Sequence, residues 1–257
     1  MDFAFLSWQS AVVCAAYFAA GLVDSICGGG GLITVPTLIT LGVPVHYIAG
    51  TNQCSAVTGN FASIYKYFRS GNVHFRSGII AAVTAIAGGI IGAELNMIIS
   101  EKYLQLVMIM LMPAIALLML LKKDFGENDL SNSLSKPKLI AYSAIIGLTV
   151  GAYQGFYGPG AGMLYMLAFA LLIKLNLVRA SGTAKLATLL AAISSSVTYA
   201  VSGFVIWRIV LAATAFNIIG NYIGASLAVK KGAKTIRPFL FGVIALLFIK
   251  LVAGFLS

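Results

Sequence analysis

Long apolar stretches alternate with short polar ones along the whole chain of 257 residues. A helix needs roughly 20 consecutive apolar residues to cross the hydrocarbon layer of a membrane. Stretches of that length predict eight spanning helices, near residues 5–26, 47–68, 77–98, 103–121, 139–157, 180–202, 207–228 and 236–255. Two further apolar stretches, 31–43 and 162–175, are too short to cross as straight helices. The pattern therefore predicts an all-α polytopic membrane protein with about eight full transmembrane helices and two short or half helices.

Composition supports this fold class. Hydrophobic residues make up 60% of the chain and charged residues 9%, and the mean hydropathy is +0.97, which is more apolar than a soluble domain requires. The first residues, "MDFAFLSWQSAVVCAAYF", lack a basic start and a small-x-small cleavage site, so they are interpreted as a transmembrane helix and not as a signal peptide. The formal net charge of +10 comes from short loops between spans. We therefore expect the lipid bilayer as a partner and do not expect nucleic acid.

The sequence contains an internal repeat. At an offset of 132, glycines and polar residues of the first half recur in the second: Gly50, Thr51, Tyr67, Ser70, Gly71, Arg76, Gly88, Gly92 and Ala93 match Gly182, Thr183, Tyr199, Ser202, Gly203, Arg208, Gly220, Gly224 and Ala225. Nearer the start of each half the offset is 130, which pairs Gly21, Gly28 and Gly30 with Gly151, Gly158 and Gly160. The one long polar stretch of the sequence, "KKDFGENDLSNSLSKPK" at 122–138, divides the two copies. We therefore predict a first transmembrane repeat at 1–121, a cytoplasmic linker at 122–138 and a second repeat at 139–257.

The placement of basic residues predicts that the two repeats are inverted. The loop "RSGNVHFR" and the linker, which carries four lysines, are placed in the cytoplasm by the positive-inside rule. In the second half the basic segment is "KKGAKTIR", and the counterpart of the first loop, "VSGFVIWR", carries only Arg208. If "KKGAKTIR" is inside, then "VSGFVIWR" is outside. The two copies would then cross the membrane in opposite directions, as in inverted-repeat transporters.

Each repeat contains a run of glycines inside apolar sequence. Gly28, Gly29, Gly30 and Gly31 stand in "LVDSICGGGGLITVP", and Gly158, Gly160 and Gly162 stand in "GFYGPGAGMLYM". Consecutive glycines do not sustain a helix, and broken backbone inside a membrane must be buried in protein or line a polar cavity. The short helix after each break would point its free N–H groups and positive dipole end at the break, which favours an anion. Close helix packing through small residues is the alternative.

Charged and amide side chains lie near these breaks. Asp24 precedes the first break, and an ionisable group within a span is costly and suggests a function. It would either accept a coupling proton or sodium ion, or cap the exposed N–H groups, and the sequence favours neither. Lys185 would either supply a cation beside the second break or extend to the membrane interface. Asn217 and Asn221, one helical turn apart, are expected to form interhelical hydrogen bonds.

A polar stripe follows the first short segment. Thr51, Asn52, Ser55 and Thr58 recur at helical spacing, so one face of that helix must meet protein or water. Thr51, Asn52 and Gln53, together with Thr183 and Lys185 in the second copy, are the candidate side-chain contacts for a substrate. No metal site or catalytic residue is predicted, because the His, Cys and carboxylate residues are too scattered.

The motifs resemble those of the TauE/SafE family of membrane permeases, often called sulfite exporters. The resemblance rests on "GLVDSICGGGGLITVPTLITLGVPVHYIAGTNQ", "GFYGPGAGMLYM", "LVRASGTAKLATLLAAI" and the pair "SGNVHF" and "SGFVIW", and it covers essentially the whole chain. It implies a bacterial or archaeal inner-membrane protein that moves small sulfur-containing or organic anions, such as sulfite or sulfonates. The family's "GTNK" pattern reads "GTNQ" here, so Gln53 replaces a lysine while Lys185 is kept. One positive charge fewer would then face the anion.

The expected function is secondary transport of a small anion by alternating access, coupled to a proton or to sodium through Asp24. An anion channel or passive facilitator is the alternative, since half-helix dipoles can select without an alternating gate. Neither an enzymatic activity nor a cofactor is expected. The chain has no G-x-x-x-x-G-K-[ST] motif for ATP. The sequence leaves open the exact substrate, the direction of transport and whether the chain forms a homo-oligomer.

Overall fold

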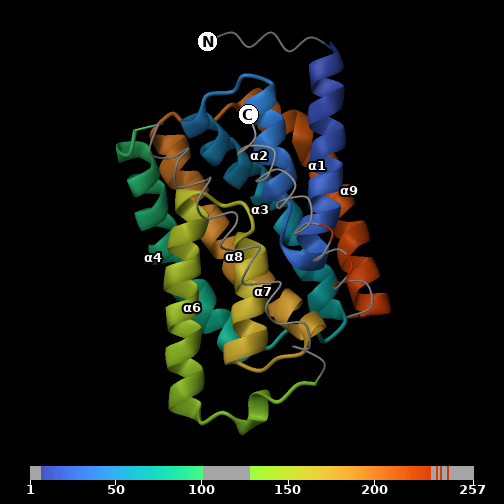
Figure 1. Ribbon diagram of the computed structural model, residues 1–257, viewed down its shortest axis with the longest axis vertical. Helices are drawn as coiled ribbons and strands as arrows, with labels where there is room; N and C mark the ends of the chain where they lie inside the picture. The colour runs from blue at the N-terminus through green and yellow to red at the C-terminus, as the bar shows by residue number, and fades with distance from the viewer. Residues whose placement is uncertain (1–6, 101–127, 233–235, 237, 239–241, 243–257) are drawn as a thin grey trace, which may run out of the picture.

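The computed structural model describes residues 7–100, 128–232, 236, 238 and 242, and over these residues it contains helices and no strand. The first half has α1 (Ser7–Cys27), α2 (Gly31–Thr40), α3 (Val45–Arg69) and α4 (Phe75–Ile98). After the short 3-10 helix η1 (Ser131–Ser133), the second half has α6 (Lys136–Phe156), α7 (Ala161–Leu172), α8 (Leu177–Val201) and α9 (Trp207–Lys231). Each half thus has a long helix, a short one and two long ones, in that order (Figure 1).

The helices match the predicted apolar stretches. Five of them, α1, α4, α6, α8 and α9, are long and apolar enough to span a membrane, and α2 and α7 are shorter apolar helices. The predicted span 47–68 corresponds to α3, which has 25 residues but buries many polar side chains. The predicted span 103–121 and nearly all of 236–255 lie outside the described residues. The chain is therefore a polytopic helical membrane protein.

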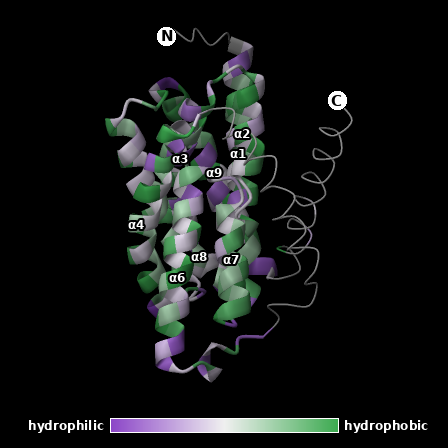
Figure 2. Cartoon of the chain, turned by 60° about the vertical axis from the view of Figure 1, so that its left-hand side comes forward, coloured by the Kyte–Doolittle hydropathy of each residue, from purple (hydrophilic) through white to green (hydrophobic). Residues whose placement is uncertain are grey.

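The outer faces of the long helices are apolar. Large hydrophobic side chains such as those of Ile98, Val201 and Leu211 are 81%, 84% and 74% exposed. Figure 2 shows hydrophilic residues around α3 and α9, and polar side chains of these two helices are buried in the bundle. The hydrophilic residues at the lower end of α6 are exposed (Figure 2). An apolar exterior around a polar interior is the arrangement that lipid requires of a spanning bundle.

The first helix of each half packs against the last helix of the other half. Helix α1 lies along α9, and α6 lies along α4. Glycines permit both contacts: a Cβ at Gly220 would lie 2.2 Å from the Phe18 carbonyl oxygen, and a Cβ at Gly88 would lie 2.4 Å from that of Leu148. Any larger residue at either position would separate the helices. The two halves are therefore interlocked and do not form separate lobes.

Corresponding helices run in opposite directions. In Figure 1, α1, α3 and α9 run downward, whereas α6, α8 and α4 run upward. The two short helices also diverge, α2 leading from the middle of the bundle to its upper end and α7 to its lower end.

The turns that join the long helices are held by threonines of the opposite half. The Thr183 hydroxyl oxygen accepts a hydrogen bond of 2.9 Å from the backbone N–H of His74, in the turn before α4. The Thr51 hydroxyl oxygen accepts one of 3.0 Å from the backbone N–H of Ile206, in the turn before α9. Thr51 and Thr183, as well as His74 and Ile206, are 132 positions apart. Each half therefore anchors the other by an equivalent hydrogen bond.

Candidate functional site

The two glycine breaks meet in the interior. Gly28 follows the last residue of α1 with a φ of +80°, a left-handed conformation that glycine adopts readily. Its carbonyl oxygen accepts a hydrogen bond of 3.2 Å from the Met163 N–H, at the start of α7. A Cβ at Gly28 would lie 2.1 Å from the carbonyl carbon of Gly162. The glycines therefore allow two interrupted backbones to touch, which no side chain would permit.

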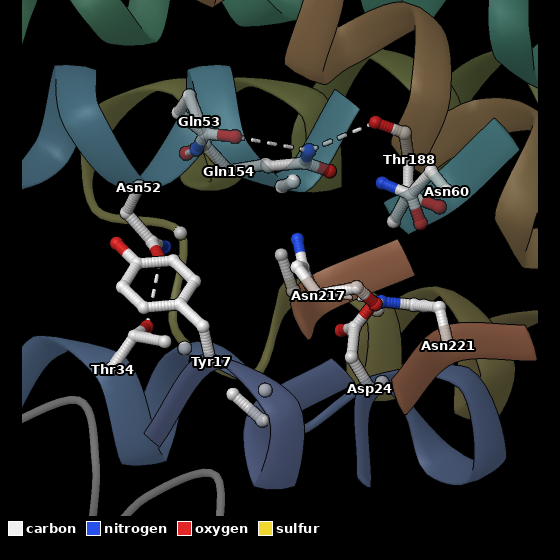
Figure 3. Close-up of a pocket in the computed structure, with 18 residues that line it drawn as sticks. Tyr17, Asp24, Thr34, Asn52, Gln53, Asn60, Gln154, Thr188, Asn217 and Asn221 are labelled. Atoms are coloured by element: carbon white, nitrogen blue, oxygen red, sulfur yellow. Dashed lines mark hydrogen bonds between the residues drawn. The ribbon is translucent and has the colours of Figure 1, made fainter. Parts of the chain in front are cut away.

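A polar cavity of about 50 Å³ lies beside this junction. Residues of α1, α2, α3, α6, α7, α8 and α9 and of both breaks surround it: Tyr17, Ala20, Asp24, Gly28, Gly30, Gly31, Thr34, Asn52, Gln53, Ala56, Asn60, Gln154, Gly158, Ala161, Gly162, Thr188, Asn217 and Asn221 (Figure 3). The volume suffices for about four water-sized groups. Nearly every described helix contributes to it, so the cavity is a product of the assembled bundle.

A pair of glutamines forms one part of the wall. The Gln53 side-chain amide donates a short hydrogen bond to the backbone carbonyl of Gln154. The Gln154 amide donates to the Thr188 carbonyl at 3.0 Å and points to the Gln53 side-chain oxygen at 3.4 Å (Figure 3). The pair joins α3 to α6 and carries no charge. It therefore presents amide dipoles to the cavity, which can orient toward an anion without adding a net charge.

An ion pair forms another part of the wall. Lys185 of α8 places its Nζ 2.5 Å from the Asp24 carboxylate of α1 and 3.3 Å from Asn60 Oδ1 of α3. The Lys185 side chain is 2% exposed and that of Asp24 is 25% exposed. Lys185 therefore lies in the interior and does not extend to the membrane interface. Helix α2 has no side-chain cap, so Asp24 does not cap this helix and its carboxylate pairs with Lys185 instead. A charge buried in this way requires its partner, because an isolated ion pays a large desolvation cost.

The two pairs occupy equivalent positions in the two halves. Asp24 and Gln154 are 130 positions apart, and Gln53 and Lys185 are 132 positions apart. The contact of Asp24 with Lys185 therefore has the contact of Gln154 with Gln53 as its counterpart. One contact is ionic and the other is neutral, so the cavity has a charged side and an uncharged side.

Amides and hydroxyls complete the lining. Asn217 of α9 donates to the Ser55 carbonyl at 2.6 Å, and the Asn221 side-chain oxygen accepts a hydrogen bond of 2.7 Å from the Ser63 hydroxyl. These bonds connect α9 to α3, which confirms the predicted interhelical role of both asparagines. The Thr34 hydroxyl donates to Asn52 at 2.7 Å, and the buried Tyr17 hydroxyl lacks a hydrogen-bond partner of ordinary geometry among the described residues. Tyr17 can therefore donate to a bound ligand.

The structure brings together most of the residues that the sequence singled out. Those that line the cavity are Asp24, Gly28, Gly30, Gly31, Asn52, Gln53, Gly158 and Gly162. Five others do not line it: Gly29, Thr51, Gly160, Thr183 and Lys185. Thr51 and Thr183 hold turns instead, and Lys185 lies behind Asp24.

Other lining residues were not predicted as site residues. Tyr17, Thr34, Asn60, Gln154 and Thr188 come from five different helices, and the sequence offers no pattern that joins them. The repeat does provide a signal for Gln154, because it is the counterpart of Asp24. Within the described ranges, no three His, Cys, Asp or Glu side chains gather in a way that could hold a metal ion. The groups that the site can present to a ligand are amides, hydroxyls and one ion pair.

Known proteins match this chain over nearly its whole length. The family model described as "Sulfite exporter TauE/SafE" matches residues 13–251. The chain is 31% identical over 238 residues to "Probable membrane transporter protein ORF9" of a Sinorhizobium species, which covers 93% of this chain and 90% of that protein. It is 32% identical over 232 residues to "Probable membrane transporter protein YfcA" of Escherichia coli K12, covering 90% and 85%. No solved structure matches it.

Proposed function

The chain belongs to the sulfite exporter TauE/SafE family of membrane transport proteins, and we propose that it is a secondary transporter that carries a small anion through the cavity between its two glycine breaks. The observation that carries this proposal is the polar cavity beside the contact of Gly28 with Gly162. The helices α2 and α7 begin at this junction and place their N-terminal dipole ends there.

The size of the cavity favours a compact substrate. About 50 Å³ holds about four water-sized groups, and sulfite has one sulfur and three oxygen atoms. An organosulfonate would need the cavity to widen around its carbon chain. Amide N–H groups of Asn52 and Gln53 and the hydroxyl of Tyr17 are the donors for its oxygens. We propose sulfite or an oxyanion of similar size as the substrate.

Alternating access is the proposed mechanism. Inverted repeats around one central cavity support an alternation of the cavity between the two sides of the membrane. Because the helices of the two halves interlock, we propose that this alternation occurs by movement between helix bundles that each contain helices of both halves. The antiparallel directions of α1 and α6 support inverted repeats at 1–121 and 139–257, with the linker 122–138 in the cytoplasm. Asp24 is the proposed site of ion coupling. The proposed location is the inner membrane of a prokaryotic cell, where the partners are the anion, the coupling ion and the lipid.

Flux measurements test this function. Purified protein in proteoliposomes is given labelled sulfite with and without an imposed proton gradient. We expect saturable uptake that exceeds equilibrium and that collapses when the gradient is removed. Downhill flux alone, indifferent to the gradient, would favour an anion channel or a passive facilitator, and the absence of flux for sulfite and for small sulfonates would refute the substrate class.

A matched pair of α3 variants connects the flux to the cavity. Asn52→Ala removes a lining amide, whereas Thr58→Ala removes a hydroxyl that bonds to the Ser55 carbonyl of its own helix and lies outside the lining. Losing one hydrogen-bond donor to an anion costs about 1.5–3 kcal/mol, so we expect the Asn52 variant to raise the KM about tenfold or more. The Thr58 variant should transport like the unaltered protein. Equal KM values for the two variants would place the substrate elsewhere.

A further inference from the structure

The cavity that the proposed function assigns to an anion is lined by a single charged side chain among the described residues, and that charge is negative. Asp24 lines the cavity and its side chain is 25% exposed, whereas the Lys185 ammonium contacts Asp24 without lining the cavity. An anion that enters therefore meets a carboxylate before it meets the lysine. With both groups ionised, the lysine's field at the cavity is largely cancelled by that of the carboxylate, and the anion gains little from it.

We propose that the anion binds together with one proton, which the Asp24 carboxylate accepts. Neutralising Asp24 removes the negative charge from the cavity wall and leaves the buried Lys185 ammonium without its counter-ion. The bound anion then takes over the role of counter-ion. The inference rests on the proposed function and deepens it: proton and anion move in the same direction, and the proton is released from Asp24 when the anion leaves.

The geometry favours a proton over sodium as the coupling ion. Sodium would need several oxygen ligands around the carboxylate, but the ammonium of Lys185 already lies 2.5 Å from Asp24 and takes the nearby Asn60 oxygen at 3.3 Å. A proton requires only one carboxylate oxygen. It also converts the contact into one between a carboxylic acid and an ammonium, which is weak enough to be exchanged for an anion.

Among the residues that the structure describes, few other titratable groups face Asp24. Helix α8 contributes Lys185, α3 contributes the Tyr67 phenol, and α1 itself contributes the Cys27 thiol. On α9 the cavity is lined by two amides, Asn217 and Asn221, and α2 and α7 line it with Thr34 and small residues. Phenols and thiols are neutral where carboxyl groups titrate. The proton that accompanies the anion is therefore assigned to Asp24.

The second half supplies a natural comparison. At the equivalent position Gln154 meets Gln53, so only one of the two related contacts can titrate. One proton per anion is therefore expected. The glutamine pair also shows that this fold accommodates a neutral contact at such a position, which makes the double variant Asp24→Gln with Lys185→Gln a structurally conservative test.

The experiment measures sulfite binding by calorimetry at several pH values, for the unaltered protein and for Asp24→Asn. The change in protonation of sulfite itself is common to both, so the ratio of the two affinities isolates Asp24. We expect the affinity of the unaltered protein divided by that of Asp24→Asn to fall by up to tenfold per unit rise in pH. At high pH, Asp24→Asn should bind sulfite more tightly than the unaltered protein does. Equal pH dependence in the two proteins, or tighter binding caused by sodium at fixed pH, would overturn the proposal.

The double variant keeps the test decisive if Asp24→Asn does not fold. With both charges removed, we expect affinity at least tenfold below that of the unaltered protein at low pH, and no pH dependence beyond that of sulfite. Affinity equal to that of the unaltered protein would refute the role of Lys185. Failure of every variant, and of the unaltered protein, to bind sulfite at any pH would instead refute the proposed substrate, which distinguishes the two failures.

Discussion

The ionic contact of Asp24 with Lys185 and the neutral contact of Gln154 with Gln53 occupy equivalent places in the two halves, yet they differ in charge. Around them the backbone is alike, since α1 packs on α9 as α6 packs on α4, and Thr51 and Thr183 hold equivalent turns. The duplicated backbone thus provides the scaffold, and the side chains that differ give the cavity one charged side and one neutral side. A change in a shared feature should affect the fold, and a change in a differing feature should affect the cavity.

The largest effect on folding is expected at Gly28, where the glycine breaks of the two halves touch. Gly28→Ala would place a Cβ 2.1 Å from the Gly162 carbonyl carbon and would impose an unfavourable φ of +80°. We expect loss of the folded protein, measured as the yield of monodisperse protein in detergent. The matched control is Gly42→Ala, which has a φ of +76° but nothing within 4 Å of the new Cβ. It should cost only about 1–2 kcal/mol. Normal folding of Gly28→Ala would show that the breaks do not depend on close approach.

The next effect separates the two polar contacts. Lys185→Met leaves the Asp24 carboxylate without its partner, which should lower the free energy of unfolding by about 3 kcal/mol. This value is at the low end of the range for broken ion pairs, because Asp24 faces the cavity. Gln53→Met removes neutral hydrogen bonds and should cost about 1 kcal/mol. Denaturant unfolding in detergent measures both, and similar costs would contradict the distinction between an ionic and a neutral side.

The threonines that hold the turns should respond equally. Thr51→Val and Thr183→Val each remove one hydrogen bond to a turn of the other half, and each should cost about 1 kcal/mol. Thr51→Ser and Thr183→Ser keep the hydroxyl and should be close to neutral. Thermal unfolding compares the four variants. A loss confined to one of the two valine variants would show that the halves are not held together equivalently.

The smallest effect concerns His74, whose counterpart is Ile206. The pKa of His74 lies below its usual value, because the imidazole is partly buried and Arg179 is nearby. The folded state therefore binds fewer protons than the unfolded chain as the pH falls below about 6.5. Stability is lost over that range and recovered as the pH rises. We expect a smaller loss between pH 7.5 and 5.5 for His74→Ile than for the unaltered protein, measured by thermal unfolding. An identical loss would exclude His74 as a source of pH dependence.

Much of the fold follows from the sequence, because lipid leaves few choices. A spanning helix needs a long apolar stretch and a break needs glycines, so α1, α4, α6, α8 and α9, the short α2 and α7, and both breaks could be predicted. The repeat also identified Gln154 as the counterpart of Asp24 before any contact was known. These features depend on local composition and on spacing along the chain.

The contacts of the site required the tertiary structure. Asp24 and Lys185 are 161 positions apart, and whether they meet depends on how α1 and α8 are rotated and how they cross. The same geometry directs Thr51 and Thr183 to turns of the opposite half and away from the cavity. An apolar pattern determines that a helix lies in the membrane, but it does not determine which neighbouring helix each polar side chain meets. Which polar side chains share a cavity is therefore decided by packing between distant segments.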